Sequence, residues 1–160
     1  MRMSFVALAA PALLIAAPAF AQATSPADYV KQAGAGDLYE RQSSQLVRSS
    51  KDAKIRDFAQ TMIAHHTKST ADVKAAAAKA GVKAPPPKLM PMQASMIADL
   101  RKATGTERDA LYVTQQKEAH QMALALHQGY AANGTSAPLK AAAAKIAPVV
   151  QSHIDMLNGM

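Results

Sequence analysis

The chain has 160 residues, no cysteine and a formal net charge of +7 at pH 7. The missing cysteines exclude disulfide bonds and thiolate metal sites, so stability must come from packing or from a bound ligand. The basic residues are scattered singly and few aromatic residues accompany them, which argues against a dedicated nucleic-acid-binding protein. The charge is compatible with peripheral contact with anionic envelope surfaces, and the oligomeric state is left open.

The first 21 residues have the features of a secretory signal peptide. Arg2 precedes an apolar, alanine-rich run, and the triplet Ala19-Phe20-Ala21 has the A-x-A pattern of a cleavage site. Polar residues follow at once, so the run is predicted to be cleaved, with no transmembrane segment in the mature chain. The alternative is a retained anchor. We therefore expect a signal over residues 1–21 and a single domain over residues 22–160, located in the periplasm or secreted.

The remaining sequence predicts an all-α protein, because alanine, lysine, glutamine and methionine are abundant and alternating β patterns are missing. The first helix is expected over about 25–50, with Ser25 as N-cap and Pro26 at the first helical position. A stripe at helical spacing is expected to face inward and contains Tyr29, Ala33, Gly36, Glu40, Ser43, Ser44 and Val47.

The second helix is expected over about 52–80, where Gly81 and the prolines at 85–87 end it. Its apolar face is predicted to hold Ile55, Phe58, Met62 and Val73. The adjacent histidines, His65 and His66, fall on either side of the centre of that face, so only one of them can be central.

An extended linker over 81–91 and a short amphipathic helix over about 92–103 form a long crossover. The next long helix is expected over about 106–132, with Thr106 as its cap and an apolar stripe of Leu111, Met122 and Leu126. A second line of side chains on this helix consists of Tyr112, Gln116, His120, Ala123, His127 and Tyr130.

The last helix is expected over about 136–157. Its seam contains Leu139, Ala142, Ile146, Val150, His153 and Leu157. Pro148 is predicted to bend this helix one turn before the histidine. Four long helices of comparable length, two short connections and one long crossover carrying a short extra helix predict a four-helix bundle of ferritin-like connectivity.

Each long helix carries one metal-capable side chain on its inward or near-inward face: Glu40, then His66 or His65, then His120 and His153. All of them lie about 14 to 17 residues from the start of their helices, so an antiparallel bundle brings them to one depth. Three imidazoles and a carboxylate suit one divalent transition metal such as zinc, copper, iron or manganese. The sequence therefore predicts a mononuclear site in the bundle core.

Two further side chains are predicted to support this site. Tyr112 and Gln116 lie two turns and one turn before His120, where they would orient the histidine rings through hydrogen bonds. His127 lies two turns beyond and is not expected to reach the same ion. The alternative is that the inward histidines and Glu40 form ordinary buried polar pairs that bind no metal.

The sequence also resembles a known family over about residues 25–158. The resemblance is carried, in order, by Glu40 with Ser44 and Leu46 and by the segments IRDFAQTMIAHHTKST, LYVTQQKEAH and IAPVVQSHIDML. The chain is similar to exported bacterial proteins of unknown function, often labelled predicted outer membrane proteins and grouped with ferritin-like bundles. The resemblance implies the fold and export, and it favours His66 over His65 because the family usually shows a polar residue followed by histidine there.

The resemblance brings no activity with it. The chain has no E-x-x-H motif, so di-iron oxidase or ferroxidase chemistry is rejected, and no nucleophile motif indicates a hydrolase. The sequence is compatible with two functions, and neither defines an enzymatic reaction. One is a periplasmic metal-binding or envelope stress-protection protein, and the other is a non-enzymatic envelope interaction protein without metal. The nine methionines make copper one of the candidate metals, although most occupy expected core positions.

Overall fold

The computed structural model describes residues 24–160, and within this range the chain is helical without any strand. The helices are α1 (Pro26–Val47), α2 (Ala53–Lys79), α3 (Pro91–Lys102), α4 (Gly105–Asn133) and α5 (Ala137–Asn158). The predicted all-α fold is confirmed, with every helix end within about three residues of its expected position. The predicted signal peptide, residues 1–21, lies outside the described residues.

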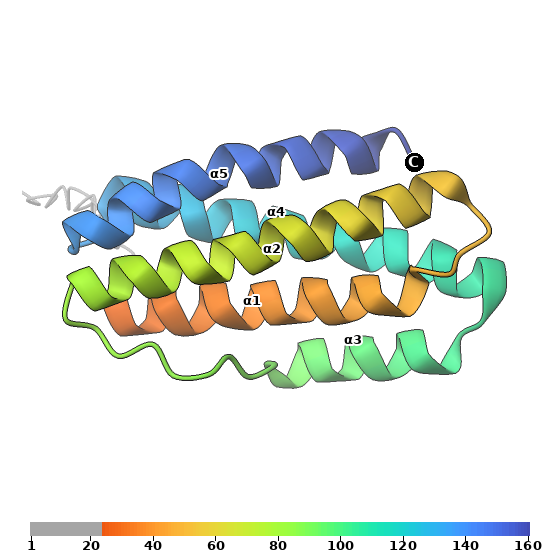
Figure 1. Ribbon diagram of the computed structural model, residues 1–160, viewed down its shortest axis with the longest axis horizontal. Coiled ribbons are helices and arrows are strands. Elements are labelled where there is room, and N and C mark those ends of the chain that lie inside the picture. The colour runs from red at the N-terminus through yellow and green to blue at the C-terminus, as the bar shows by residue number, and fades with distance from the viewer. Residues whose placement is uncertain (1–23) are drawn as a thin grey trace, which may run out of the picture.

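Four long helices form the bundle, with α3 alongside it (Figure 1). α1 packs on α2 and α4 packs on α5, while α1 also contacts α4 and α2 contacts α5. Each long helix runs antiparallel to both of its neighbours (Figure 1). α2 ends at the opposite end of the bundle from the start of α4, so the linker and α3 run back along α1. This is the predicted ferritin-like connectivity with a long crossover.

Local signals in the sequence set most of the helix ends. The Ser25 hydroxyl accepts a hydrogen bond of 3.1 Å from the Asp28 amide, as an N-cap residue does. Gly81 has a φ of 67°, which few other residues tolerate, and it follows the last turn of α2. The prediction of Thr106 as a cap is wrong. Gly105 has a φ of 54° and begins α4 earlier, so Thr104 is the N-cap residue.

Within residues 24–160 the core contains three apolar clusters, and two of them lie toward opposite ends of the bundle. One cluster includes Tyr29, Val73 and Leu139, and the other includes Phe58 and Leu157. The middle of the bundle lies between these clusters and is packed by polar side chains from all four long helices. Apolar packing at both ends therefore fixes the relative positions of the four helices at the level of these polar groups.

The predicted apolar stripe of α4 is not the buried face of this helix. Met122 is 46 % exposed, and Leu111 and Leu126 are only partly buried. The inward face is the second line, whose buried members are Tyr112, Gln116, His120, His127 and Tyr130. The helix presents polar groups to the middle of the bundle, so hydrophobicity does not mark its inward side. On α1, Gly36 is only half-buried, whereas the rest of its predicted stripe is buried.

None of the helices in residues 24–160 combines the length and the apolar character needed to cross a bilayer.

Candidate metal centre

The structure brings together the four side chains that were predicted to meet in the bundle. Glu40 of α1, His66 of α2, His120 of α4 and His153 of α5 lie at the same level, and none is more than 3 % exposed. His65, the alternative to His66, lies on the exposed side of α2. The pattern of one inward polar residue per helix was therefore sufficient to locate this cluster.

Three imidazoles form the centre of the cluster. His66, His120 and His153 each offer a ring nitrogen, and these nitrogens all lie within 4.8 Å of one another. The Nε2 atom of His120 lies 3.3 Å from the Nδ1 atom of His153. Two nitrogens that each bind a tetrahedral ion at about 2.0 to 2.1 Å are about 3.3 to 3.4 Å apart. This pair is therefore spaced as two ligands of one ion would be.

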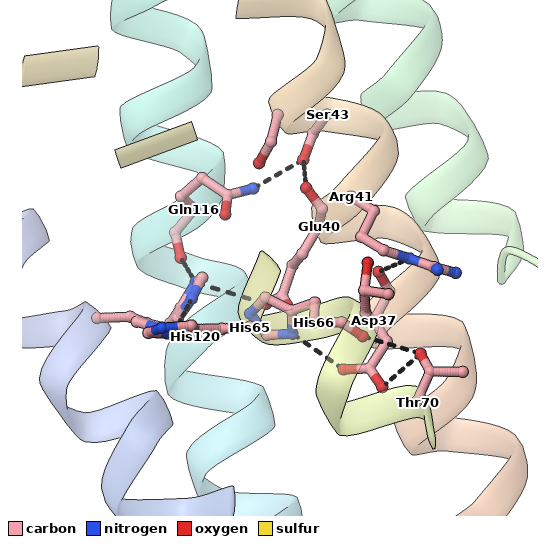
Figure 2. Close-up of polar contacts among 12 residues, drawn as sticks. Asp37, Glu40, Arg41, Ser43, His65, His66, Thr70, Gln116 and His120 are labelled. Carbon is pink, nitrogen blue, oxygen red and sulfur yellow. Dashed lines mark hydrogen bonds and ion pairs between the residues drawn. The ribbon is translucent and has the colours of Figure 1, made fainter. Parts of the chain in front are cut away.

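The second nitrogen of each ring is held by a neighbouring group. His66 Nδ1 lies 2.9 Å from Asp37 Oδ1 and 2.7 Å from Glu40 Oε2 (Figure 2). His120 Nδ1 donates to the backbone oxygen of Gln116 at 2.9 Å, which places the lone pair of the neutral ring on Nε2. Metal-bound histidines in proteins are oriented in the same way, with the second nitrogen on a carboxylate, a carbonyl or another partner.

The third ring is oriented by the other histidine of the HH pair. His153 Nε2 lies 2.8 Å from His65 Nδ1, and their rings are stacked at a centroid distance of 5.1 Å. His65 thus supports the cluster from its exposed side. The sequence offered His65 as the alternative to His66, and the structure places it against His153.

One buried ring nitrogen of the cluster has no partner within the described residues. His66 Nε2 is buried and finds no hydrogen-bond partner within residues 24–160. Leaving a buried polar group unpaired costs about 1 to 3 kcal/mol. The His66 ring is fixed by two carboxylates on its opposite nitrogen, so it cannot turn Nε2 elsewhere without losing those contacts. This atom is consequently available for an ion held between the three rings.

Charge is unevenly distributed over the cluster. Burial alone would raise the pKa of Glu40, but the neighbouring imidazoles, first His66 and then His120, lower it to about 2. Burial would lower the pKa of His66, but Glu40 and Asp37 raise it to about 10. Burial and the nearby rings lower the pKa of His153 to about 3 and also lower that of His120. At neutral pH, the metal-free cluster therefore holds one imidazolium and two neutral imidazoles.

Asp37 is a member of the site that the sequence analysis missed. It is 3 % exposed, contacts His66, and accepts a hydrogen bond of 2.9 Å from the Thr70 hydroxyl. Asp37, Glu40 and His66 form a second group whose potential ligand atoms lie within 4.8 Å of one another. The available signal was the spacing of Asp37, one turn before Glu40 on the same helix face.

The two predicted supporting residues have different roles. Gln116 orients His120 through its backbone oxygen, while its side-chain amide donates to the Ser43 hydroxyl at 3.0 Å (Figure 2). The hydroxyl of Tyr112 pairs with that of Ser44 at 2.8 Å and holds no histidine ring. The prediction for Tyr112 as a partner of the rings is therefore not supported by its contacts.

The fifth histidine is separate from the cluster, as expected. His127 Nδ1 pairs with the Tyr29 hydroxyl at 3.0 Å, and burial lowers the pKa of His127 to about 4. Its own partner satisfies it within the apolar end of the bundle. His127 and His120 are therefore both buried histidines of α4, but only His120 lies beside the other histidines of the cluster.

The chain belongs to the family described as Domain of unknown function (DUF4142), which matches it over residues 12–160. This confirms the resemblance to a family of unknown function. No curated protein and no solved structure matches the chain. The family description names no activity, so the proposed function depends on the side chains of the bundle core.

Proposed function

We propose that this protein is exported and binds one divalent transition-metal ion in its core, serving metal binding or protection of the envelope. The ligands are His66 Nε2, His120 Nε2 and His153 Nδ1. Imidazole nitrogen is a good donor for zinc, copper and iron, and the absence of thiolates and of E-x-x-H motifs in the sequence favours a single ion.

One observation carries this proposal: all three rings are held by one of their nitrogens, while His66 Nε2 is buried and has no partner among residues 24–160. A network that served packing alone would have no reason to leave that atom unpaired, because a hydrogen-bonded or apolar replacement avoids the cost. An ion bound at His66 Nε2 would replace the proton that this imidazolium carries, and it would remove the unpaired donor.

The role proposed for Glu40 differs from that of the rings. Its Oε2 atom lies 2.7 Å from His66 Nδ1, and its Oε1 atom lies 3.5 Å from His120 Nδ1. Both of these are the outer nitrogens, on the far side of the rings from the proposed ion. Glu40 and Asp37 are therefore assigned to orienting His66 and to balancing the charge of an ion bound by neutral ligands.

Metal binding by His120→Gln and by His127→Gln, compared with the unchanged protein, tests the proposal. Both histidines are buried on α4, but only His120 belongs to the cluster. Elemental analysis and zinc titration are expected to give one ion per chain for the unchanged protein and for His127→Gln. His120→Gln should bind at least about 100-fold more weakly, because one of three ligands is gone. Equal metal content in all three proteins would support the alternative, in which the buried polar groups serve packing.

A further inference from the structure

A second feature of the molecule is a pocket of about 260 Å³ on the side of the bundle that α3 covers. Its lining comes from α1, α3 and α4, from His66 of α2 and from the end of the linker. Four methionines contribute to it: Met90, Met92, Met96 and Met122. The opposite part of the lining includes Asp37, Glu40 and His66, so the pocket reaches the carboxylate side of the imidazole cluster.

The methionines around this pocket are placed where a core residue would not be. Met90, Met92 and Met122 are 37 %, 52 % and 46 % exposed, and they make up half of the six exposed large hydrophobic side chains in the described range. Methionine ordinarily fills gaps in a core, as Met62 does at 0 % exposure. Exposed thioethers that gather from three segments of the chain around one pocket are not explained by packing.

The inner wall of the pocket carries two carboxylates and the imidazole ring that pairs with them. Glu40 is 1 % exposed, and its Oε2 atom lies 2.7 Å from His66 Nδ1. Asp37 lies beside it, one turn earlier on α1. An apolar occupant would cover the methionines but would make no use of the two carboxylates. A cation with an affinity for sulfur would use both walls.

We propose that this pocket binds Cu(I) through the thioethers of Met90, Met92 and Met122, with Met96 as a neighbouring sulfur. Thioethers are soft, neutral ligands that select Cu(I) over the hard and borderline divalent ions. The carboxylates of Asp37 and Glu40 supply the negative charge that neutral ligands lack. Since Glu40 and His66 belong both to the pocket wall and to the imidazole cluster, a captured ion lies next to the proposed divalent site.

The proposal is tested with a methionine-to-leucine exchange, which keeps apolar volume and removes sulfur. Met92→Leu with Met122→Leu changes two pocket residues, and Met156→Leu with Met160→Leu is the matched control, since both of those are exposed outside the pocket. All variants carry His120→Gln, so that loss of the imidazole site cannot be mistaken for loss of the thioether site. Cu(I) affinity is measured without oxygen by competition with a chromophoric Cu(I) chelator.

The pocket variant is expected to bind Cu(I) at least about tenfold more weakly than its parent, and the control variant should match the parent. In parallel, silver(I) should shift the methyl NMR signals of Met90, Met92 and Met122 but not that of buried Met62. Equal Cu(I) affinities, or silver-induced shifts spread evenly over all methionines, would overturn the proposal. Because zinc binding by the imidazoles is measured separately with the histidine unchanged, failure of one site is distinguishable from failure of the other.

Discussion

Replacing Glu40 with glutamine separates the two roles that a carboxylate can have beside a metal. The change keeps shape and removes the negative charge that faces His66 Nδ1 at 2.7 Å. His66 still has Asp37 at 2.9 Å as an acceptor, so the ring keeps its orientation. Loss of one outer-sphere partner lowers metal affinity by about 10- to 100-fold, which corresponds to about 1.4 to 2.7 kcal/mol.

The assay is a cobalt(II) titration, in which the visible spectrum reports the ligands and competition with a chelator gives the affinity. Glu40→Gln is expected to bind cobalt about 10- to 100-fold more weakly than the unchanged protein and to keep its cobalt spectrum. Glu118→Gln, at an exposed position on α4, is the matched control and should change neither quantity. If Glu40→Gln altered the cobalt spectrum or removed saturable binding, Glu40 would be a ligand, and the outer-sphere assignment would be wrong.

Three further predictions concern the stability of the metal-free protein. Its free energy of unfolding should be greatest near the ordinary histidine pKa of 6.5. The pKa of His66 is raised to about 10, so its contribution is lost as pH rises from 6.5 through 10. The pKa values of His127 and His153 are lowered to about 4 and about 3, so their contributions are lost as pH falls from 6.5 through those values. Urea unfolding with chelator at several pH values measures these losses, which are expected to reach up to about 1.4 kcal/mol per pH unit. A free energy of unfolding that did not change with pH would contradict the assigned charges. In the same urea assay, Gly129→Ala should stabilise the protein by about 0.8 to 1 kcal/mol, because Gly129 lies within α4 with nothing within 4 Å of an added Cβ. Gly134→Ala should destabilise it by about 1 to 3 kcal/mol, because its Cβ would lie 2.6 Å from a backbone oxygen, and the opposite order would refute the packing at that turn.

The fold was predictable because its signals are local. Ser25, Asp52 and Gly81 mark helix ends through hydrogen bonds or backbone angles that depend on neighbouring residues only. The depth of the cluster followed from counting residues along helices of similar length. This count needs only a constant rise per residue and a short connection between α1 and α2.

The details of the site were less predictable because they depend on which way each side chain turns. The sequence places Glu40 near the histidines but does not say that its oxygens face the outer nitrogens of the rings. Asp37 was missed as well, because in the sequence it resembles any other charged residue on a helix. The apolar stripe of α4 is not its buried face because a polar core breaks the link between hydrophobicity and burial, as exposed Met122 and buried Gln116 show.

The central claim is that three imidazoles from three helices bind one ion, and anomalous X-ray diffraction from zinc-loaded crystals tests it most directly. One anomalous peak per chain is expected, about 2.0 to 2.1 Å from His66 Nε2, His120 Nε2 and His153 Nδ1. The absence of a peak between these rings, or a peak bound only by residues outside them, would contradict the account.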